Sequence, residues 1–411
     1  MLNSRELLTI GQRVKYFRER RGLTQKALGE LVCRTESWQW KVEHDQLPVD
    51  RISTLITYSQ VLRCTVEDLT GGHLSGHGTG LDTEHKHVPA IRAVMSLPPS
   101  LLPVTAGSVE DFKEGVDSAW EVYETQAKGR YQEVGARLPQ LLCLGHAALH
   151  GASDAESPVA LRQLVSLYGL FQIWLRRVGE PTLARIAADR GLALADSAGD
   201  PALVAAAAWN LSCVLTSVGE VQDSVELARQ TIAKCAPTED SPVEHWSAYG
   251  ALHLQAAVAA VRATQGPIAW DLYRGAQLAA RRVGSDRNHW HACFGPSNVA
   301  MHEVHLTAEE GNVGEALRLA DTVEVNPELP LERRTRYLIE VMNCNRIQGD
   351  DYATVHVLGK LRKQSPEEII FSPLVREAVV ALLKREKPMF REDLRKVAAH
   401  IGITPDRRGA P

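Results

Sequence analysis

The N-terminal region, residues 1–70, carries short runs in which apolar positions recur every three or four residues, a spacing typical of amphipathic helices. Two such faces consist of Ile10, Val14 and Phe17, and of Ala27, Leu28 and Leu31. Gly22 separates them, and Thr24 and Thr35 stand where a hydroxyl group caps the start of a helix. The pattern predicts two short helices, a tight turn and a third helix beginning after Thr35. Apolar positions in 49–69 predict two further helices, giving about five in all.

A glycine-rich run, residues 71–80, follows this compact stretch. Glycine loses much backbone entropy on folding, so the run is expected to be flexible. Prolines at 98, 99 and 103 then interrupt a short helical pattern at Val88–Met95. We therefore predict a helix-turn-helix domain in 1–70, a flexible linker in 71–107, and a second domain in 108–411.

The second domain repeats a simple unit in which a glycine ends one helix and precedes the next. These glycines are Gly129, Gly179, Gly219, Gly266, Gly311 and Gly349. They recur at intervals of roughly 40 to 50 positions, a period typical of helix pairs stacked in a solenoid. Alanines recur where paired helices approach closely, and in this the region 108–386 resembles the tetratricopeptide repeat, although its period is longer than that repeat's. The expected fold class is all-α: a small helix-turn-helix domain followed by an α-solenoid of tetratricopeptide-like helix pairs.

Composition fits a folded protein without a membrane segment. Hydrophobic residues make up 44% and charged residues 23% of the chain. The seven cysteines are dispersed, and the N-terminus lacks a long apolar stretch, so a reducing cytoplasmic location without membrane contact is expected. The formal net charge is −4, yet residues 11–41 hold eight Lys or Arg against three Glu. Such a run is compatible with a solvated helix face or with binding to phosphates.

A local motif distinguishes between these alternatives. The stretch Gly22–Leu28, followed by Cys33–Glu43, resembles the Xre family of helix-turn-helix transcriptional regulators over about residues 10–70. The resemblance implies that the third helix enters the major groove of double-stranded DNA.

The resemblance also implies roles for individual residues. Gln25 matches a position that hydrogen-bonds a phosphate, although it is also compatible with an ordinary helix start. Glu36, Ser37 and Lys41 match base-facing positions, and Trp40 is expected beside them on the exposed side. Further candidates, for the DNA backbone, are Arg34 and Arg51.

Three departures from the family pattern accompany the motif. Gln39 replaces a buried Ile or Val, Trp40 replaces a Ser, and His44-Asp45 replaces the pair, ending in glycine, that usually closes the helix. Trp38 or Val42 is expected to turn inward, and Trp38 to take over the missing core contact.

The repeat domain offers polar residues for a groove. Its layout is similar to that of peptide-pheromone regulators of the PlcR and PrgX kind, in which asparagines on helical repeats bind a peptide backbone. By this resemblance the effector-groove candidates are Asn210, Trp290, Asn298, His302, Tyr337 and Asn343. Ordinary core or surface roles are the alternative for each. His302 and His305 also have a spacing that metal ligands use, but packing within the array explains it equally well.

The sequence favours a DNA-binding transcriptional regulator that acts as a homodimer and responds to a peptide or small-molecule effector. An alternative is a protein-interaction scaffold whose helix-turn-helix module does not read DNA. No nucleotide-binding loop, nucleophile elbow or carboxylate pair is evident, so no cofactor, metal or catalytic activity is expected. An enzyme would require a metal at the His-rich segment 288–305.

Overall fold

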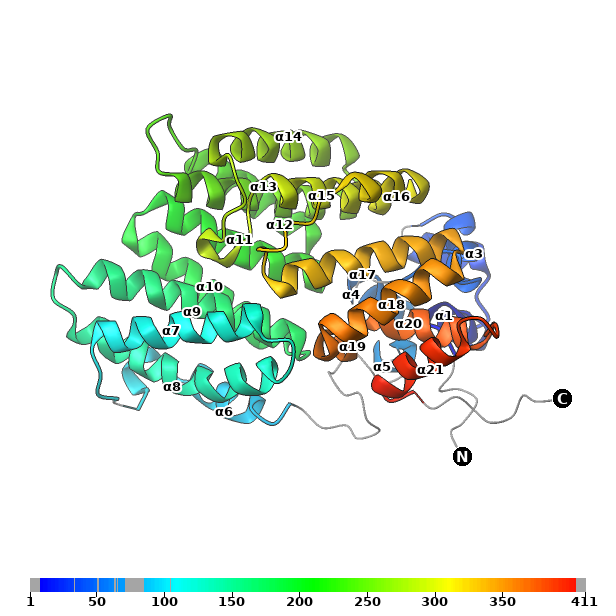
Figure 1. Ribbon diagram of the computed structural model, residues 1–411, viewed down its shortest axis with the longest axis horizontal. Coiled ribbons are helices and arrows are strands. Elements are labelled where there is room, and N and C mark those ends of the chain that lie inside the picture. The colour runs from blue at the N-terminus through cyan, green and yellow to red at the C-terminus, as the bar shows by residue number, and fades with distance from the viewer. Residues whose placement is uncertain are drawn as a thin grey trace. The chain divides into compact units, whose positions relative to one another are not determined.

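The computed structural model describes residues 8–32, 34–49, 52–62, 64, 66–70, 85–103 and 105–403. All regular elements in this part of the chain are helices, and only an isolated antiparallel bridge joins Arg287 to Phe294. The predicted all-α fold is confirmed (Figure 1). The described residues form two compact units, here called the terminal unit (8–70 with 335–403) and the central unit (85–334).

The terminal unit begins with five short helices. These are α1 (Ile10–Arg20), α2 (Gln25–Leu31), α3 (Glu36–Glu43), α4 (Ile52–Leu62) and α5 (Val66–Thr70). Their shared core includes Val14, Leu28, Val42 and Leu55, each at most 2% exposed. Leu31 is 54% exposed, so its expected place on the inner face of α2 is wrong.

The same unit contains helices from the end of the chain. They are the greater part of α17 (Leu331–Gln348), then α18 (Asp351–Gln364), α19 (Pro366–Phe371), α20 (Pro373–Leu383) and α21 (Arg391–His400). An apolar core of their own, which includes Leu358, Ile369, Val379 and Leu394, joins α18 to α21. The expected domain 108–411 placed residues 335–403 with the repeats. In the structure these residues group instead with the N-terminal helices.

The central unit is a stack of helix pairs preceded by a short helix. Its helices are α6 (Val88–Met95), α7 (Val109–Thr125), α8 (Arg130–Gly151), α9 (Ser157–Arg177), α10 (Pro181–Ala198), α11 (Pro201–Val218), α12 (Val221–Lys234), α13 (Val243–Arg262), α14 (Gly266–Val283), α15 (Pro296–Glu309) and α16 (Val313–Thr322), with 3₁₀ turns η1 (Pro99–Leu101) and η2 (His289–His291). Each pair packs on the next, as Figure 1 shows for α9 to α14.

Glycine turns separate most of these helices. Of the six glycines predicted from the sequence, all but Gly266 have a positive φ, as at Gly219 (φ 90°). Gly266 instead begins α14, and Thr264 takes the left-handed conformation before it (φ 61°). The sequence therefore predicted a turn near Gly266 correctly, but the residue with the left-handed backbone conformation is Thr264.

Small residues let neighbouring helices approach closely in the centre of the stack. Ala276 and Ala279 of α14 are fully buried in one cluster with Ala256 and Ala260 of α13. Among the described helices, α11 alone has the length and mean hydropathy (1.5) to span a membrane, and 78% of that stretch is buried inside the protein. Its apolar composition follows from its contacts with α9, α10, α12 and α13.

The expected linker 71–107 is too long at its C-terminal end. Within it, α6 places Val88, Ile91 and Met95 in the core, each at most 1% exposed, and packs on α8. The spacing of three and four positions gives this short segment one continuous apolar face, and burying that face offsets the entropy of ordering it. Residues 71–84, which include the glycine-rich run, lie outside the described residues.

Candidate nucleic-acid interface

Threonine side chains cap the starts of α1, α2 and α3, and at α1 the hydroxyl of Thr9 accepts the Gln12 N–H at 3.2 Å. The hydroxyl of Thr24 accepts the Ala27 N–H at 3.1 Å, and that of Thr35 accepts the Trp38 N–H at 3.1 Å. Both caps were predicted from the sequence and are confirmed. The turn between α2 and α3 is tight, because a Cβ at Gly29 would lie 3.0 Å from the Arg34 carbonyl oxygen. These contacts fix where α3 begins.

A buried polar network holds α3 from behind. The Glu43 carboxylate accepts hydrogen bonds from Arg18 at 2.6 and 2.9 Å, from Gln39 at 2.8 Å and from Gln25 at 2.8 Å. The Tyr58 hydroxyl donates to Gln39 Oε1 at 2.6 Å. The network thus links α1, α2, α3 and α4 through the last residue of α3.

The electrostatics of the network keep Glu43 ionised. Burial alone would raise the pKa of Glu43, but hydrogen bonds from Arg18, Gln25 and Gln39 lower it below its usual value. The same bond to Glu43 raises the pKa of Arg18. Burial, followed by the charge of Glu43, raises the pKa of Tyr58, so its hydroxyl stays a hydrogen-bond donor.

The outer face of α3 is polar and open. Glu36, Ser37 and Lys41 are exposed, and Trp40 is 41% exposed. These are the positions that the sequence predicted to face outward. Together they present a carboxylate, a hydroxyl, an ammonium and an indole along one side of a two-turn helix, a set suited to base edges and phosphates.

The inner face of α3 differs from the expectation in one respect. Val42 is fully buried, as expected, and Trp38 is half-buried with its ring stacked on Tyr58, at 6.4 Å between centroids. Gln39, however, is itself fully buried rather than replaced by Trp38. The polar side chain is tolerated because both ends of its amide are hydrogen-bonded, to Glu43 and to Tyr58.

Asp45 takes the place of the usual glycine after α3. Its φ is 57°, in the left-handed region that glycine favours. The carboxylate accepts hydrogen bonds from Thr9 Oγ1 at 2.5 Å and Gln12 Nε2 at 2.9 Å. These bonds tie the end of α3 to the start of α1 and offset the backbone strain.

The remaining DNA candidates have varied positions. Gln25 is half-buried and donates to Glu43, so it is oriented by the network at the start of α2. Arg34 is half-buried and lies over the Trp38 ring, 5.4 Å from its centroid. Arg51 lies outside the described residues. The roles of these residues in DNA binding stay predictions.

Sequence reasoning missed Arg18, Glu43 and Tyr58 as members of the site. A signal was present, since Arg18 follows Val14 on the apolar face of α1 and Glu43 follows the buried Val42. Charged residues at core-facing positions indicate a buried partner. The pairing of Arg18 with Glu43 joins two separate helices, and such a tertiary feature is not contained in the local pattern.

The effector-groove candidates divide between the two units. Asn298 and His302 meet in α15, where His302 Nδ1 lies 2.7 Å from the Asn298 carbonyl oxygen, and Asn298 Oδ1 accepts a bond from Arg333. Tyr337 and Asn343 belong to the terminal unit. Asn298, Tyr337 and Asn343 are at most 6% exposed, so these three do not present their side chains to a groove. The sequence predicted open polar positions here, but neighbouring side chains cover them.

Asn210 of α11 belongs to a chain of hydrogen bonds with two residues of α9. Its Oδ1 accepts a hydrogen bond from Gln172 at 2.7 Å, and Gln172 Oε1 accepts one from Arg176 at 3.0 Å. Asn210 is half-buried, so an effector role for it stays a prediction.

Trp290 lies in the 3₁₀ turn η2, in a loop whose side chains contact other helices of the central unit. Its indole donates to the Glu244 carbonyl oxygen at 2.8 Å, and the adjacent His291 stacks on Trp120, with centroids 3.8 Å apart. His291 Nδ1 also lies 2.8 Å from Glu124 Oε1. Trp290 and His291 have φ of 57° and 56°, within the range rarely adopted by non-glycine residues. The loop is therefore held by specific side-chain contacts.

The alternative interpretation of His302 and His305 as metal ligands finds no third ligand. His305 Nε2 lies 3.6 Å from Glu309, and in the described part of the chain no three His, Cys, Asp or Glu side chains are grouped to hold an ion.

Comparisons with known proteins assign no family to this chain. No protein-family model matches the sequence, and no curated protein matches it. Among solved structures, the chain is similar to the crystal structure of Bacillus thuringiensis PlcR in complex with the peptide PapR7 and DNA, at 14% identity over 67% of this chain and 95% of that chain. The TM-score is 0.29, too low to assign a function or an arrangement of parts to this chain.

Proposed function

We propose that this protein is a sequence-specific DNA-binding transcriptional regulator of the helix-turn-helix kind. The observation that carries the proposal is the contrast between the two sides of α3. Its inner side is fixed by a buried network, whereas Glu36, Ser37, Trp40 and Lys41 stand exposed on the outer side. A rigid helix with free polar groups is what direct readout of a major groove requires.

Residues that departed from the family pattern do not weaken this proposal. Gln39 is fully hydrogen-bonded in the interior, and Asp45 adopts the backbone conformation of the glycine that it replaces. Such departures would favour the alternative, a scaffold that uses the helix-turn-helix module only for protein contacts. With both accommodated, DNA binding is the stronger proposal.

The proposal includes a homodimer. A single recognition helix contacts too few base pairs for high specificity, and paired helices address half-sites roughly 34–36 Å apart. We further propose that the helical-repeat region contributes to dimerisation and binds a peptide or small-molecule effector, and that the protein acts in the cytoplasm without catalysis. The six described cysteines are free thiols, which supports a reducing compartment.

Selection from random duplexes followed by mobility shift tests sequence-specific DNA binding directly. The full chain should enrich a short motif and bind it at least a thousandfold more tightly than unrelated DNA at the same salt concentration. The control is a variant with Ser37 and Lys41 both changed to alanine, which leaves the buried network intact. Loss of the enriched motif in the control supports the proposal, whereas a wild-type chain that enriches no motif contradicts it.

Effector binding needs its own test. A library of short peptides and cell metabolites is screened by the thermal shift of the full chain, and hits are added to the mobility-shift assay. An effector must bind one state better than the other to change DNA affinity. An Asn210→Ala variant that loses the response, with an unchanged DNA affinity in its absence, supports a site on the repeats; an unaltered response removes Asn210 from it.

A further inference from the structure

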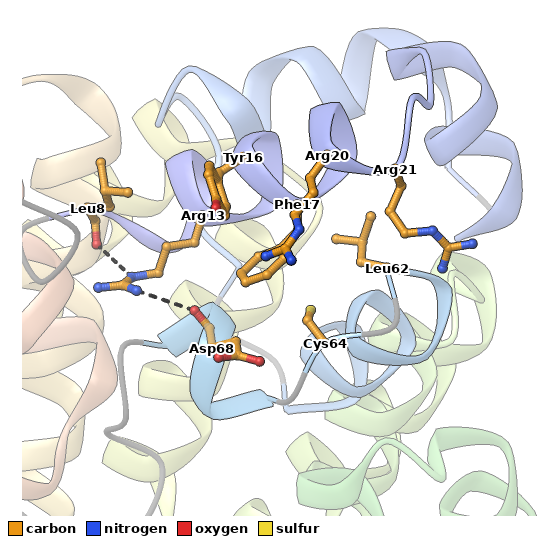
Figure 2. Close-up of a pocket in the computed structure, with 9 residues that line it drawn as sticks. All are labelled: Leu8, Arg13, Tyr16, Phe17, Arg20, Arg21, Leu62, Cys64 and Asp68. Carbon is orange, nitrogen blue, oxygen red and sulfur yellow. Dashed lines mark hydrogen bonds between the residues drawn. The ribbon is translucent and has the colours of Figure 1, made fainter.

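A cavity of about 430 Å³ lies within the five N-terminal helices. Figure 2 shows the residues that line it, with α1 side chains along one edge and the end of α4 and α5 opposite. The lining consists of Leu8, Arg13, Tyr16, Phe17, Arg20, Arg21, Leu62, Cys64 and Asp68. Its volume falls within the range of small-molecule sites, roughly 300–1,000 Å³.

The cavity faces away from α3. Gly11 and Arg18 of α1 contact α3, since a Cβ at Gly11 would clash with the Val42 carbonyl oxygen and Arg18 pairs with Glu43. Arg13, Phe17 and Arg20 follow one another at steps of four and three positions and so share another side of the helix. An occupant of the cavity therefore leaves the outer face of α3 open.

Positive charge dominates the lining. Among the described residues of the lining, three carry a guanidinium group and one, Asp68, carries a carboxylate. Arg13 is held by the carbonyl oxygens of Leu8 and Asp68 at 3.2 and 3.3 Å, and Arg21 by that of Val61 at 2.9 Å. Carbonyl oxygens orient a guanidinium without cancelling its charge, and these bonds fix the directions in which Arg13 and Arg21 point.

Arg20 is the least constrained of the three. Its side chain is exposed, and within the described residues no hydrogen bond or ion pair holds it. A guanidinium offers five N–H donors in a planar fork that matches a carboxylate, sulfonate or phosphate. Arg20 therefore has the freedom to close on an anion that enters the cavity.

The rest of the lining is apolar and aromatic. Tyr16 and Phe17 meet edge to face with ring centroids 5.1 Å apart, and Leu62 is 1% exposed. Burial, with the nearby charge of Asp68, raises the pKa of the Cys64 thiol to about 11, so this wall is neutral at physiological pH. Such walls favour a flat apolar body beside the charged group.

We propose that this cavity binds a small aromatic anion, with its acidic group on Arg20 and its ring against Tyr16 and Phe17. The helix-turn-helix region then carries a ligand site of its own, separate from any effector site on the repeats. This inference is independent of the proposed DNA binding, because the site and its occupant involve no nucleic acid.

Calorimetric titration of the full chain in the absence of DNA tests the site. The probe is naphthalene-2-carboxylate, and its neutral partner of the same shape is naphthalene-2-carboxamide. We expect one-to-one binding of the carboxylate, with the carboxamide at least about tenfold weaker, which corresponds to the loss of one charge-assisted hydrogen bond. Inorganic phosphate, which lacks the ring, should bind no better than the carboxamide.

Variants assign the binding to this cavity. Arg20→Gln should weaken the carboxylate about tenfold and leave the carboxamide unchanged, while Arg20→Lys should restore part of the loss by keeping the charge. Arg318→Gln, at an exposed arginine of the central unit, is the matched control. Equal affinity for carboxylate and carboxamide, or equal carboxylate binding by wild type and Arg20→Gln, overturns the proposal, as does the absence of binding at millimolar probe. Melting curves of each variant verify that the fold is retained.

Discussion

The carboxylate of Glu43 accepts hydrogen bonds from both Nε and Nη2 of Arg18, at 2.6 and 2.9 Å, in the interior of the N-terminal helices. The Glu43 side chain is fully buried and that of Arg18 is 10% exposed. The pair joins α1 to the last residue of α3. Its removal therefore acts on the placement of α3 as well as on stability.

Glu43→Gln should lower the free energy of unfolding by about 3 kcal/mol, because it leaves the buried Arg18 guanidinium with only the exposed carboxylate of Glu19, 3.4 Å away, as a counter-charge. Chemical denaturation of the full chain, followed by a signal from the terminal unit, measures the change. Glu392→Gln, which removes the exposed pair with Lys396 in α21 of the terminal unit, is the control and should leave the free energy of unfolding nearly unchanged. A similar small cost for Glu43→Gln would show that the buried pair contributes no net stability.

Acidic pH should reduce the contribution of the Arg18–Glu43 pair to the free energy of unfolding. The pKa of Glu43 is lower in the folded chain than in the unfolded one, so its stabilising effect is fully present above the unfolded value of about 4.3. The effect is lost as pH falls through the folded pKa, where protonation ends the pairing with Arg18. The stability difference between wild type and Glu43→Gln should therefore be constant from about pH 5 to 7 and should shrink below about pH 4. Denaturation curves across this range test the sign, and a difference that grows in acid would contradict it.

Gln39 and Tyr58 should behave as a coupled pair. Gln39→Leu leaves the Tyr58 hydroxyl without its acceptor, and Tyr58→Phe leaves Gln39 Oε1 without its donor, so each change should cost about 1–3 kcal/mol. The double variant should cost about 1 kcal/mol less than the sum, because neither unsatisfied partner remains. A double-mutant cycle by denaturation gives the coupling energy. Strict additivity would mean that the bond does not contribute.

Asp45 should show a specific order of substitutions. Asp45→Ala loses the bonds from Thr9 and Gln12 and keeps a strained positive φ, and it should cost about 2 kcal/mol. Asp45→Gly loses the same bonds but removes the strain, so it should be about 1 kcal/mol more stable than the alanine variant. Melting temperatures of the two proteins test this order, and a more stable alanine variant would contradict the positive φ.

Lys41 should contribute electrostatically to DNA binding. If its ammonium contacts a phosphate, Lys41→Ala weakens binding to all sequences alike and reduces the salt-dependence slope by about 1. If it donates to a guanine, the loss falls on one position of the selected motif and costs about 1–3 kcal/mol there. Binding curves at several salt concentrations, on the motif and on unrelated DNA, separate these outcomes. An unchanged affinity for both DNAs would remove Lys41 from the interface.

Local patterns in the sequence determined where most of the helices begin and end and which side of α3 is exposed. The caps at Thr24 and Thr35, the glycine turns and the open side of α3 all follow from residues within a few positions of one another, because helix ends and amphipathic faces depend on short-range contacts. The resemblance of residues 10–70 to a helix-turn-helix family rests on the same short-range information.

Only the tertiary structure determined which helices pack together and which polar side chains they bury. The pairing of Arg18 with Glu43, the burial of Gln39 and the cavity beside Arg20 each depend on which helices meet, and helices that meet are separated by long stretches of chain. The same holds for the grouping of residues 335–403 with the N-terminal helices. Periodicity gives each helix a buried side, but many partners satisfy an apolar face equally well, so only the packed fold determines which partner it has.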